Sequence, residues 1–115
     1  MNKWVLLGIV VFLLVGISVT PKWSAEQEQA IGLGREFLDN IGLQTGKALS
    51  VGLIDEVPAG YLYYWHSAKG LDIPDVQEPG QCWLIRFENG YSPGHWWEVL
   101  IDTNTSEVVG GMSCR

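Results

Sequence analysis

The sequence predicts an α+β domain, with one amphipathic helix packed on an antiparallel β-sheet of about four strands, preceded by an N-terminal hydrophobic segment. Three observations carry this prediction: an uncharged run near the N-terminus, a capped helical pattern after Ser24, and alternating apolar residues in the last third of the chain. A helix followed by strands that turn directly back on one another is typical of a two-layer arrangement. The apolar face of the sheet then covers the helix.

The N-terminal segment has no charged side chain at residues 4–19. As a helix these residues span roughly 24 Å, less than the ~30 Å core of a bilayer but more than the core of a usual signal peptide. Trp4 and Trp23 bracket the run, as interfacial aromatic anchors do. We therefore divide the chain into a signal-anchor or signal peptide at 1–22 and an extracytoplasmic domain at 23–115. The protein is expected in the cell membrane as a single-pass chain, or secreted if the segment is cleaved.

The net charge of the exported part limits the classes of partner that it can bind. Beyond Lys22 the chain has 13 acidic and 5 basic side chains, a formal net charge of −8. Such a surface repels phosphate backbones, so we expect no nucleic-acid partner. The negative charge either favours cationic partners and metal ions or simply keeps an exported domain soluble.

The helix begins at a capping box. The hydroxyl of Ser24 can accept a hydrogen bond from the backbone N–H of the third helical residue, Gln27. The side chain of Gln27 can in turn accept from the backbone N–H of Ser24. Gly32 and Gly34 either weaken the helix or allow it to approach a sheet closely. Asn40 and Gly42 are expected to end the helix. At about 100° per residue one apolar stripe forms, which consists of Ala30, Leu33, Gly34, Phe37, Leu38 and Ile41.

Strands are predicted from alternating apolar residues. Residues 47–55 form a first strand with Leu49, Val51 and Leu53 on one face, and residues 61–66 form a compact aromatic strand. An acidic loop follows over residues 67–81. Three consecutive antiparallel strands then cover the stretches 82–88, 96–102 and 108–109.

The last hairpin carries a resemblance. Its turn reads Asp102-x-x-Thr105-x-Glu107 and leads into Val-Val, which resembles the closing hairpin of PepSY domains, small extracytoplasmic modules of peptidase propeptides and bacterial membrane proteins. That family has Gly where Ser106 stands. The resemblance covers the helix at 24–40 and the strands at 82–109. A cystatin-like domain has a similar order of elements, but its Gln-x-Val-x-Gly loop is absent here.

The resemblance implies binding rather than catalysis, with residues 56–81 as an insertion in the shorter family pattern. It further implies contact with, or inhibition of, an envelope or secreted peptidase in trans. The alternative is a sensory or scaffolding envelope subunit with no protease target. No cofactor is implied.

Residue patterns for catalysis or metal binding are weak. His66 and His95 are not in a metal-ligand spacing, and no family signature surrounds Cys82 as a thiol nucleophile. A run of carboxylates at every third position does not have the spacing of a calcium loop and is read as a solvated acidic loop; it consists of Asp72, Asp75 and Glu78. We expect no catalytic, cofactor or metal residue.

Exposed aromatic side chains beside the acidic loop predict a partner-binding patch. A strand in a two-layer fold cannot bury both of its faces, so some aromatic residues should remain exposed. The predicted patch consists of Tyr63, Trp65, Trp96, Asp72, Asp75 and Glu78. In the alternative, the insertion folds back and buries the aromatic side chains.

Two further expectations concern covalent and turn chemistry. Cys82 and Cys114 are expected to pair, because two cysteines in a small exported domain usually form a disulfide. In a plain meander the two cysteines are separated by roughly 20 Å along the strand direction. Pairing therefore requires the last strand to break at Gly110 and Gly111. In the hairpin turn, the short side chains of Asp102 and Thr105 are expected to cap backbone donors, a structural rather than catalytic role.

Overall fold

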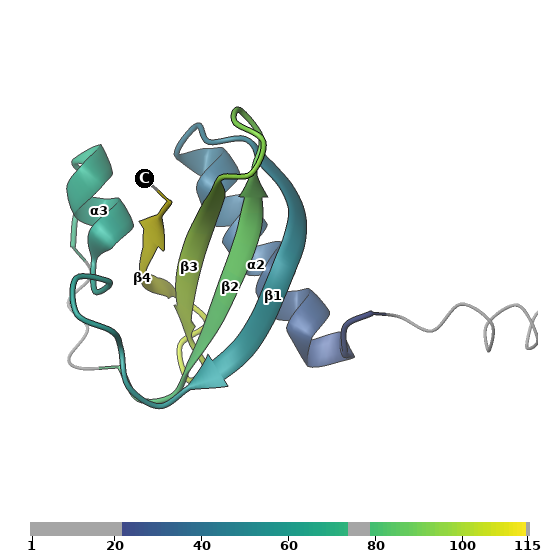
Figure 1. The fold of residues 1–115 in the computed structure, drawn as a ribbon. Helices are drawn as coiled ribbons and strands as arrows, with labels where there is room; N and C mark the ends of the chain where they lie inside the picture. The colour runs from purple at the N-terminus through teal and green to yellow at the C-terminus, as the bar shows by residue number, and fades with distance from the viewer. Residues whose placement is uncertain (1–21, 74–78, 115) are drawn as a thin grey trace, which may run out of the picture.

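The computed structural model describes residues 22–73 and 79–114 (Figure 1). One helix packs on a four-stranded antiparallel sheet with strand order β1-β2-β3-β4, which confirms the expected helix-on-sheet architecture. The elements are α2 (Ala25–Asn40), β1 (Thr45–Ile54), α3 (Tyr64–Lys69), β2 (Cys82–Asn89), β3 (Trp96–Asp102) and β4 (Val108–Ser113). In the described part of the chain no helix is long and apolar enough to cross a membrane. The expected membrane segment at 4–19 lies outside the described residues.

Helix α2 begins as the sequence predicts. The hydroxyl of Ser24 accepts from the backbone N–H of Gln27 at 3.1 Å, and the side chain of Gln27 accepts from the N–H of Ser24 at 2.8 Å. Gly34 lets the helix approach the sheet, because a Cβ at this position would lie 3.1 Å from the ring of Phe87. The helix ends before Gly42, which has a positive φ of 85°.

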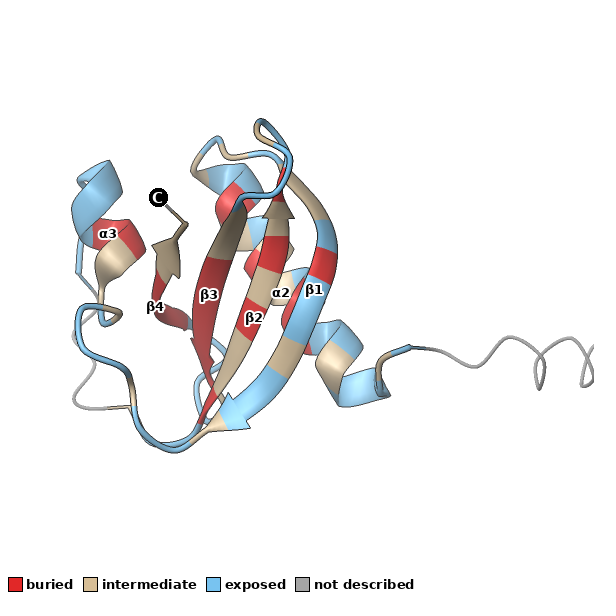
Figure 2. Ribbon diagram, viewed as in Figure 1, coloured by how far each residue is buried: buried red, intermediate tan, exposed pale blue. Residues whose placement is uncertain are grey.

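The core lies between α2 and the inner face of the sheet (Figure 2). Residues Ile85 and Phe87 of β2 and Val99 of β3 are completely buried against Leu38 of α2. Burial of each such side chain contributes about 1.5–3 kcal/mol. The alternation that predicted β2 and β3 therefore identified the inner face of these strands correctly.

Strand β1 differs from the prediction. Leu49, Val51 and Leu53 were expected to share one face. Val51 and Leu53 do share the inner face, opposite Ile85 and Trp83, although Leu53 is 48% exposed, whereas Leu49 does not follow this alternation and is 39% exposed. The pairing with β2 shifts register on either side of Ala48, so that Ala48 rather than Leu49 is buried against the core. An irregularity of this kind adds a residue to one strand and reverses the facing of its neighbour.

The predicted aromatic strand at 61–66 is also wrong. Tyr63 adopts a left-handed conformation with φ 57°, and the short helix α3 starts directly after it. A strand cannot continue through this backbone reversal. Only Leu62 makes a β-bridge, to Gly110 of β4.

Residues 55–69 wrap around the β4 edge, and we call them the wrap. Val57 and Tyr61 pack on the outer face of the sheet over Leu100. The N–H of Tyr63 then donates to Val109 at 2.7 Å. On the helix side Trp65 is buried, and its indole donates to the backbone oxygen of Glu98 at 2.7 Å. The wrap thus covers the face that α2 leaves bare.

The two glycines of β4 make room for the wrap. A Cβ at Gly110 would collide with the backbone oxygen of Tyr61, and one at Gly111 would collide with the indole of Trp65 and the backbone oxygen of Glu98. The strand continues through both glycines rather than breaking at them. They serve close packing and do not redirect the chain.

The expected disulfide between Cys82 and Cys114 does not form. Cys82 lies opposite Asp102, whereas the N–H of Cys114 donates to Trp96 at the other end of β3. An offset of six residues along a strand is roughly 20 Å, far beyond the limit of about 7 Å between bridged α-carbons. Because β4 does not break at its glycines, the two cysteines remain apart.

The turn between β3 and β4 has the predicted structural role. Asp102 Oδ1 accepts from the N–H of Asn104 at 2.8 Å, and Thr105 Oγ1 accepts from that of Glu107 at 3.3 Å. Ser106 is left-handed, with φ 58°. This conformation explains why a glycine would suit the position.

Replacement of Gly110 with Ala should lower the free energy of unfolding by about 1–3 kcal/mol, because the new methyl group overlaps the wrap backbone. As a matched control, Gly32→Ala places its methyl group where no atom lies within 4 Å, and it should raise stability by about 0.5–1 kcal/mol through helix propensity. Urea unfolding of the two variants measures the difference. Equal changes in the unfolding free energy of the two variants would show that the wrap does not pack closely against Gly110.

Replacement of Ser106 with Gly should raise stability by about 0.5–1 kcal/mol, because glycine adopts the left-handed conformation without steric cost. Thr105→Gly, one residue earlier, removes a capping oxygen and should lower stability. Thermal melts of both variants give the comparison. A destabilised Ser106→Gly protein would mean that the Ser106 side chain contributes more than its backbone conformation costs.

Candidate binding site

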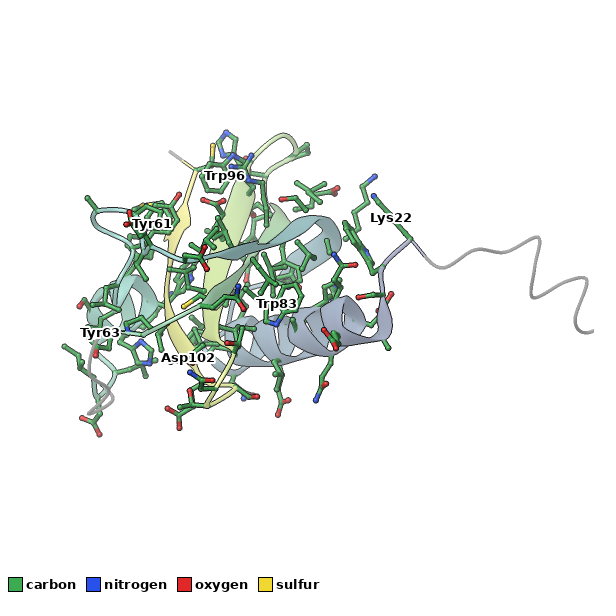
Figure 3. The ribbon with its side chains drawn as sticks, turned by 90° about the horizontal axis from the view of Figure 1, so that it is seen from below. Lys22, Tyr61, Tyr63, Trp83, Trp96 and Asp102 are labelled. Carbon is green, nitrogen blue, oxygen red and sulfur yellow. The ribbon has the colours of Figure 1, made fainter. Side chains whose placement is uncertain are left out.

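The predicted partner patch is not one surface. Trp65 is only 3% exposed and cannot contact a partner, so this part of the prediction is wrong. Tyr63 and Trp96 are half-buried and lie well apart (Figure 3). Asp72 is exposed, and Asp75 and Glu78 lie outside the described residues. Among the described members of the patch, the structure brings no aromatic pair together for binding.

Trp96 instead belongs to a charged network on the outer face of the sheet. Glu98 is 3% exposed, and its carboxylate accepts from the hydroxyl of Tyr61 at 2.6 Å and from Arg86 at 3.3 Å. The guanidinium of Arg86 lies 4.2 Å from the ring centre of Trp96. Burial and the hydrogen bond to Glu98 raise the pKa of Tyr61 to about 12. The network attaches the wrap to the sheet and therefore has a structural role.

Cys82, considered above as a thiol nucleophile, and His95, which could serve as a base, lie at opposite ends of β2. Cys82 begins the strand and is fully buried, whereas His95 lies beside Asn89, which ends it. Burial and the nearby charge of Asp102 raise the pKa of the Cys82 thiol. The described residues also contain no cluster of three His, Cys, Asp or Glu side chains that could hold a metal ion.

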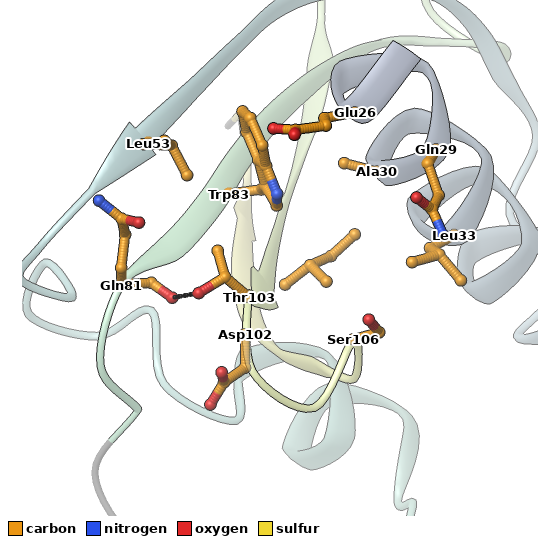
Figure 4. Close-up of a pocket in the computed structure, with 11 residues that line it drawn as sticks. Glu26, Gln29, Ala30, Leu33, Leu53, Gln81, Trp83, Asp102, Thr103 and Ser106 are labelled. Atoms are coloured by element: carbon orange, nitrogen blue, oxygen red, sulfur yellow. Dashed lines mark hydrogen bonds between the residues drawn. The ribbon is translucent and has the colours of Figure 1, made fainter.

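A groove of about 290 Å³ opens between α2 and the sheet (Figure 4). Trp83 forms its floor, between Leu53 of β1 and Ala30 and Leu33 of α2. We call it the helix–sheet groove. Its polar rim and remaining wall consist of Glu26, Gln29, Gln81, Ile101, Asp102, Thr103 and Ser106.

The rim of the helix–sheet groove is firmly built. The hydroxyl of Thr103 donates to the backbone oxygen of Gln81 at 3.0 Å, and the N–H of Thr103 donates to the same oxygen at 3.1 Å. The side chain of Gln81 donates to Asp55 at 3.3 Å. These bonds tie the end of β1 to the start of β2 and the end of β3, so the groove is present before any partner arrives.

The groove has a definite chemical character. Its lining residues include one exposed carboxylate, that of Glu26, and no basic side chain. Asp102 also borders the groove, but its carboxylate is buried and points away from Trp83 (Figure 4). An apolar floor with an acidic rim suits an occupant that carries both apolar and cationic groups. The side chain of Leu53 borders this floor and is exposed to solvent.

Sequence reasoning missed this groove because Leu53 and Trp83 were both assigned to a closed inner face. One signal was available: in a meander the first strand lies at the edge of its sheet, so an apolar residue near its end borders solvent. Leu53 occupies such a position.

The stability of the domain should depend on pH through His66. It is buried beside Phe37 at a ring separation of 5.6 Å, and its Nδ1 has no hydrogen-bond partner among the described residues. Burial lowers the pKa of His66. The unfolded chain therefore takes up a proton below about pH 6.5 while the folded protein stays neutral. The contribution of neutral His66 to the free energy of unfolding is therefore fully present above this pH, and it is lost as the pH falls through the lower pKa of the folded state.

The unfolding free energy of the wild type should fall with acid by up to about 1.4 kcal/mol per pH unit from this group. His66→Phe keeps an aromatic ring but has no titrating group, so its stability should depend less on pH. Urea unfolding between about pH 7.5 and 5 compares the two proteins. Parallel loss of stability in both would show that His66 does not control the acid response.

No protein-family model, no curated protein and no solved structure matches this chain. The likeness to PepSY domains therefore rests on the residues of the helix and the closing hairpin.

Proposed function

We propose that this chain is a PepSY-like binding module of the cell envelope, and that it holds a segment of an envelope or secreted peptidase in the helix–sheet groove. It would act on that peptidase in trans. The observation that supports the proposal is the groove itself, an apolar floor at an exposed strand with an acidic rim. Concave sites of this kind are where proteins most often bind their ligands.

The chemistry of the groove favours binding over catalysis. Its eleven described lining residues include no histidine, cysteine or lysine, the usual bases and nucleophiles. The hydroxyl of Thr103 is engaged by Gln81, and the carboxylate of Asp102 caps Asn104. The polar groups of the rim are thus used to build the site.

Charge supports a cationic target. The domain has a strong acidic excess, and the groove carries the exposed carboxylate of Glu26 without a basic counterpart. Opposite charge on a partner speeds encounter and selects against acidic competitors. A segment rich in lysine or arginine meets both conditions.

The proposed location follows from the N-terminal sequence. The uncharged residues 4–19 would hold the chain in the membrane, with the domain outside. Lys22 and Trp23 come just before α2, whose first turn contributes Glu26 to the groove. A tethered domain would meet its peptidase at the membrane surface.

Leu53→Glu should reduce capture of the target by at least about tenfold, because it places a charge in the apolar floor. Leu49→Glu is the matched control, since Leu49 is an exposed leucine of the same strand outside the groove. The measurement is photo-crosslinking from Gln29 in intact membranes, followed by identification of the captured protein.

The identity of the captured protein decides between the two envelope functions. A peptidase, lost with Leu53→Glu and kept with Leu49→Glu, supports the proposal. A non-peptidase captured with the same dependence would favour a sensory or scaffolding subunit. Equal capture by both variants would contradict any role for the groove.

A further inference from the structure

We infer that the partner segment binds as an added β-strand on the open edge of β1, and that it is an extended peptide with alternating apolar side chains and at least one lysine or arginine. This inference rests on the proposed function and specifies its mode of recognition. Strand addition uses main-chain hydrogen bonds for affinity and alternate side chains for specificity. Both elements are present beside the helix–sheet groove.

The free backbone groups of β1 can be located from the ladder. Asn89 of β2 donates its N–H to His95, and Thr103 donates to Gln81, so odd-numbered residues of β2 direct their backbone toward β3. Successive strand residues alternate in direction. Val51 and Leu53 lie opposite odd-numbered partners of β2. Their N–H and C=O groups therefore point away from β2, to the open edge.

The two edges of the sheet differ. At β4, the N–H of Tyr63 donates to Val109 and the N–H of Gly111 donates to Tyr61 at 2.9 Å, so the wrap closes this edge. Within the described ranges β1 pairs only with β2. An incoming strand can therefore dock at one side of the sheet.

The usable part of the β1 edge is short. Arg35 donates to the backbone oxygen of Gly46 at 2.7 Å, and the ladder is irregular on either side of Ala48. Regular pairing with β2 runs from Ser50 to Ile54. Five residues at about 3.3 Å each give a docking edge of roughly 17 Å.

The helix–sheet groove supplies side-chain recognition for this edge. Figure 1 shows the first turns of α2 extending past the outer side of β1. A peptide residue beside Leu53 directs its side chain toward the same face as Leu53, above Ala30 and Leu33 of α2. Glu26 and Asp55 flank the segment with exposed carboxylates, which is why the occupant carries a cation.

A second copy of the chain is the competing occupant. Two domains with a formal charge of −8 each repel one another. Leu53 and Val51 alone supply the apolar side chains of the regular edge on this face. A basic peptide gains attraction where a second copy meets repulsion.

The test begins with random heptapeptides displayed on phage and selected on the full chain in detergent. Enriched peptides should alternate apolar residues and contain lysine or arginine. Each is then synthesised in three forms: unmodified, with methyl groups on the odd-numbered backbone nitrogens, and with methyl groups on the even-numbered ones. Methylation removes docking donors without changing any side chain and without risk to the folding of the protein.

The unmodified peptide should slow amide exchange of Val51 and Leu53 by at least about tenfold, and one methylated register should bind at least about tenfold more weakly than the other. Gly52 lies opposite Leu84 on the β2 side and serves as the internal control. Together these results would establish strand addition.

Three outcomes would overturn the inference. Peptides that depend on Leu53 but leave the Val51 and Leu53 amides unchanged would fill the groove without joining the sheet, so the proposed function would stand. Failure to enrich any peptide, with crosslinking to a peptidase retained, would indicate a folded binding surface instead. Protection of these amides that rises with protein concentration alone would identify a second copy as the occupant.

Discussion

Glu98 is the residue on which the arrangement of the domain depends, because it holds the wrap on both faces of the sheet. Its backbone oxygen accepts from the indole of Trp65 on the helix side, and its carboxylate accepts from Tyr61 on the outer face. A four-stranded sheet with one covering helix leaves an apolar face in water. The wrap covers that face, and a single residue of β3 holds it at two points, Tyr61 and Trp65.

Burying the carboxylate of Glu98 and bringing the wrap close to β4 both cost free energy, which the neighbouring residues offset. A buried carboxylate without a partner would be strongly destabilising, and Arg86 supplies the opposite charge. The indole of Trp65 and the backbone of Tyr61 approach β4 so closely that no side chain fits there, which accounts for Gly110 and Gly111. The glycine pair and the ion pair between Arg86 and the buried Glu98 are thus two requirements of the same covering segment.

Sequence patterns predicted the features whose causes are local. The capping box at Ser24 and the turn at Asp102 depend on hydrogen bonds within a few residues, and the alternation of β2 reports burial on a single face. The aromatic composition of residues 61–66 favours a strand, whereas their contacts with β4 and α2 belong to a turn and a helix. Local reasoning left the burial of Trp65 by the insertion as an alternative that it could not decide, and it did not reveal the register shift at Leu49. The groove was missed for the same reason, since its floor residues were correctly placed on one face but the open edge beside them was not considered.

The closed edge at β4 and the open edge at β1 together limit how this sheet can grow. A fibril of stacked sheets needs two open edges on every molecule, because each copy must both receive and offer a strand. Among the residues that the structure describes, the sheet of this domain has one open edge, at β1. Copies joined through β1 would form a two-fold pair with no edge left over. The segment that shields the outer face thereby also makes the domain unable to propagate a β-polymer, a useful property for a protein with an exposed edge strand.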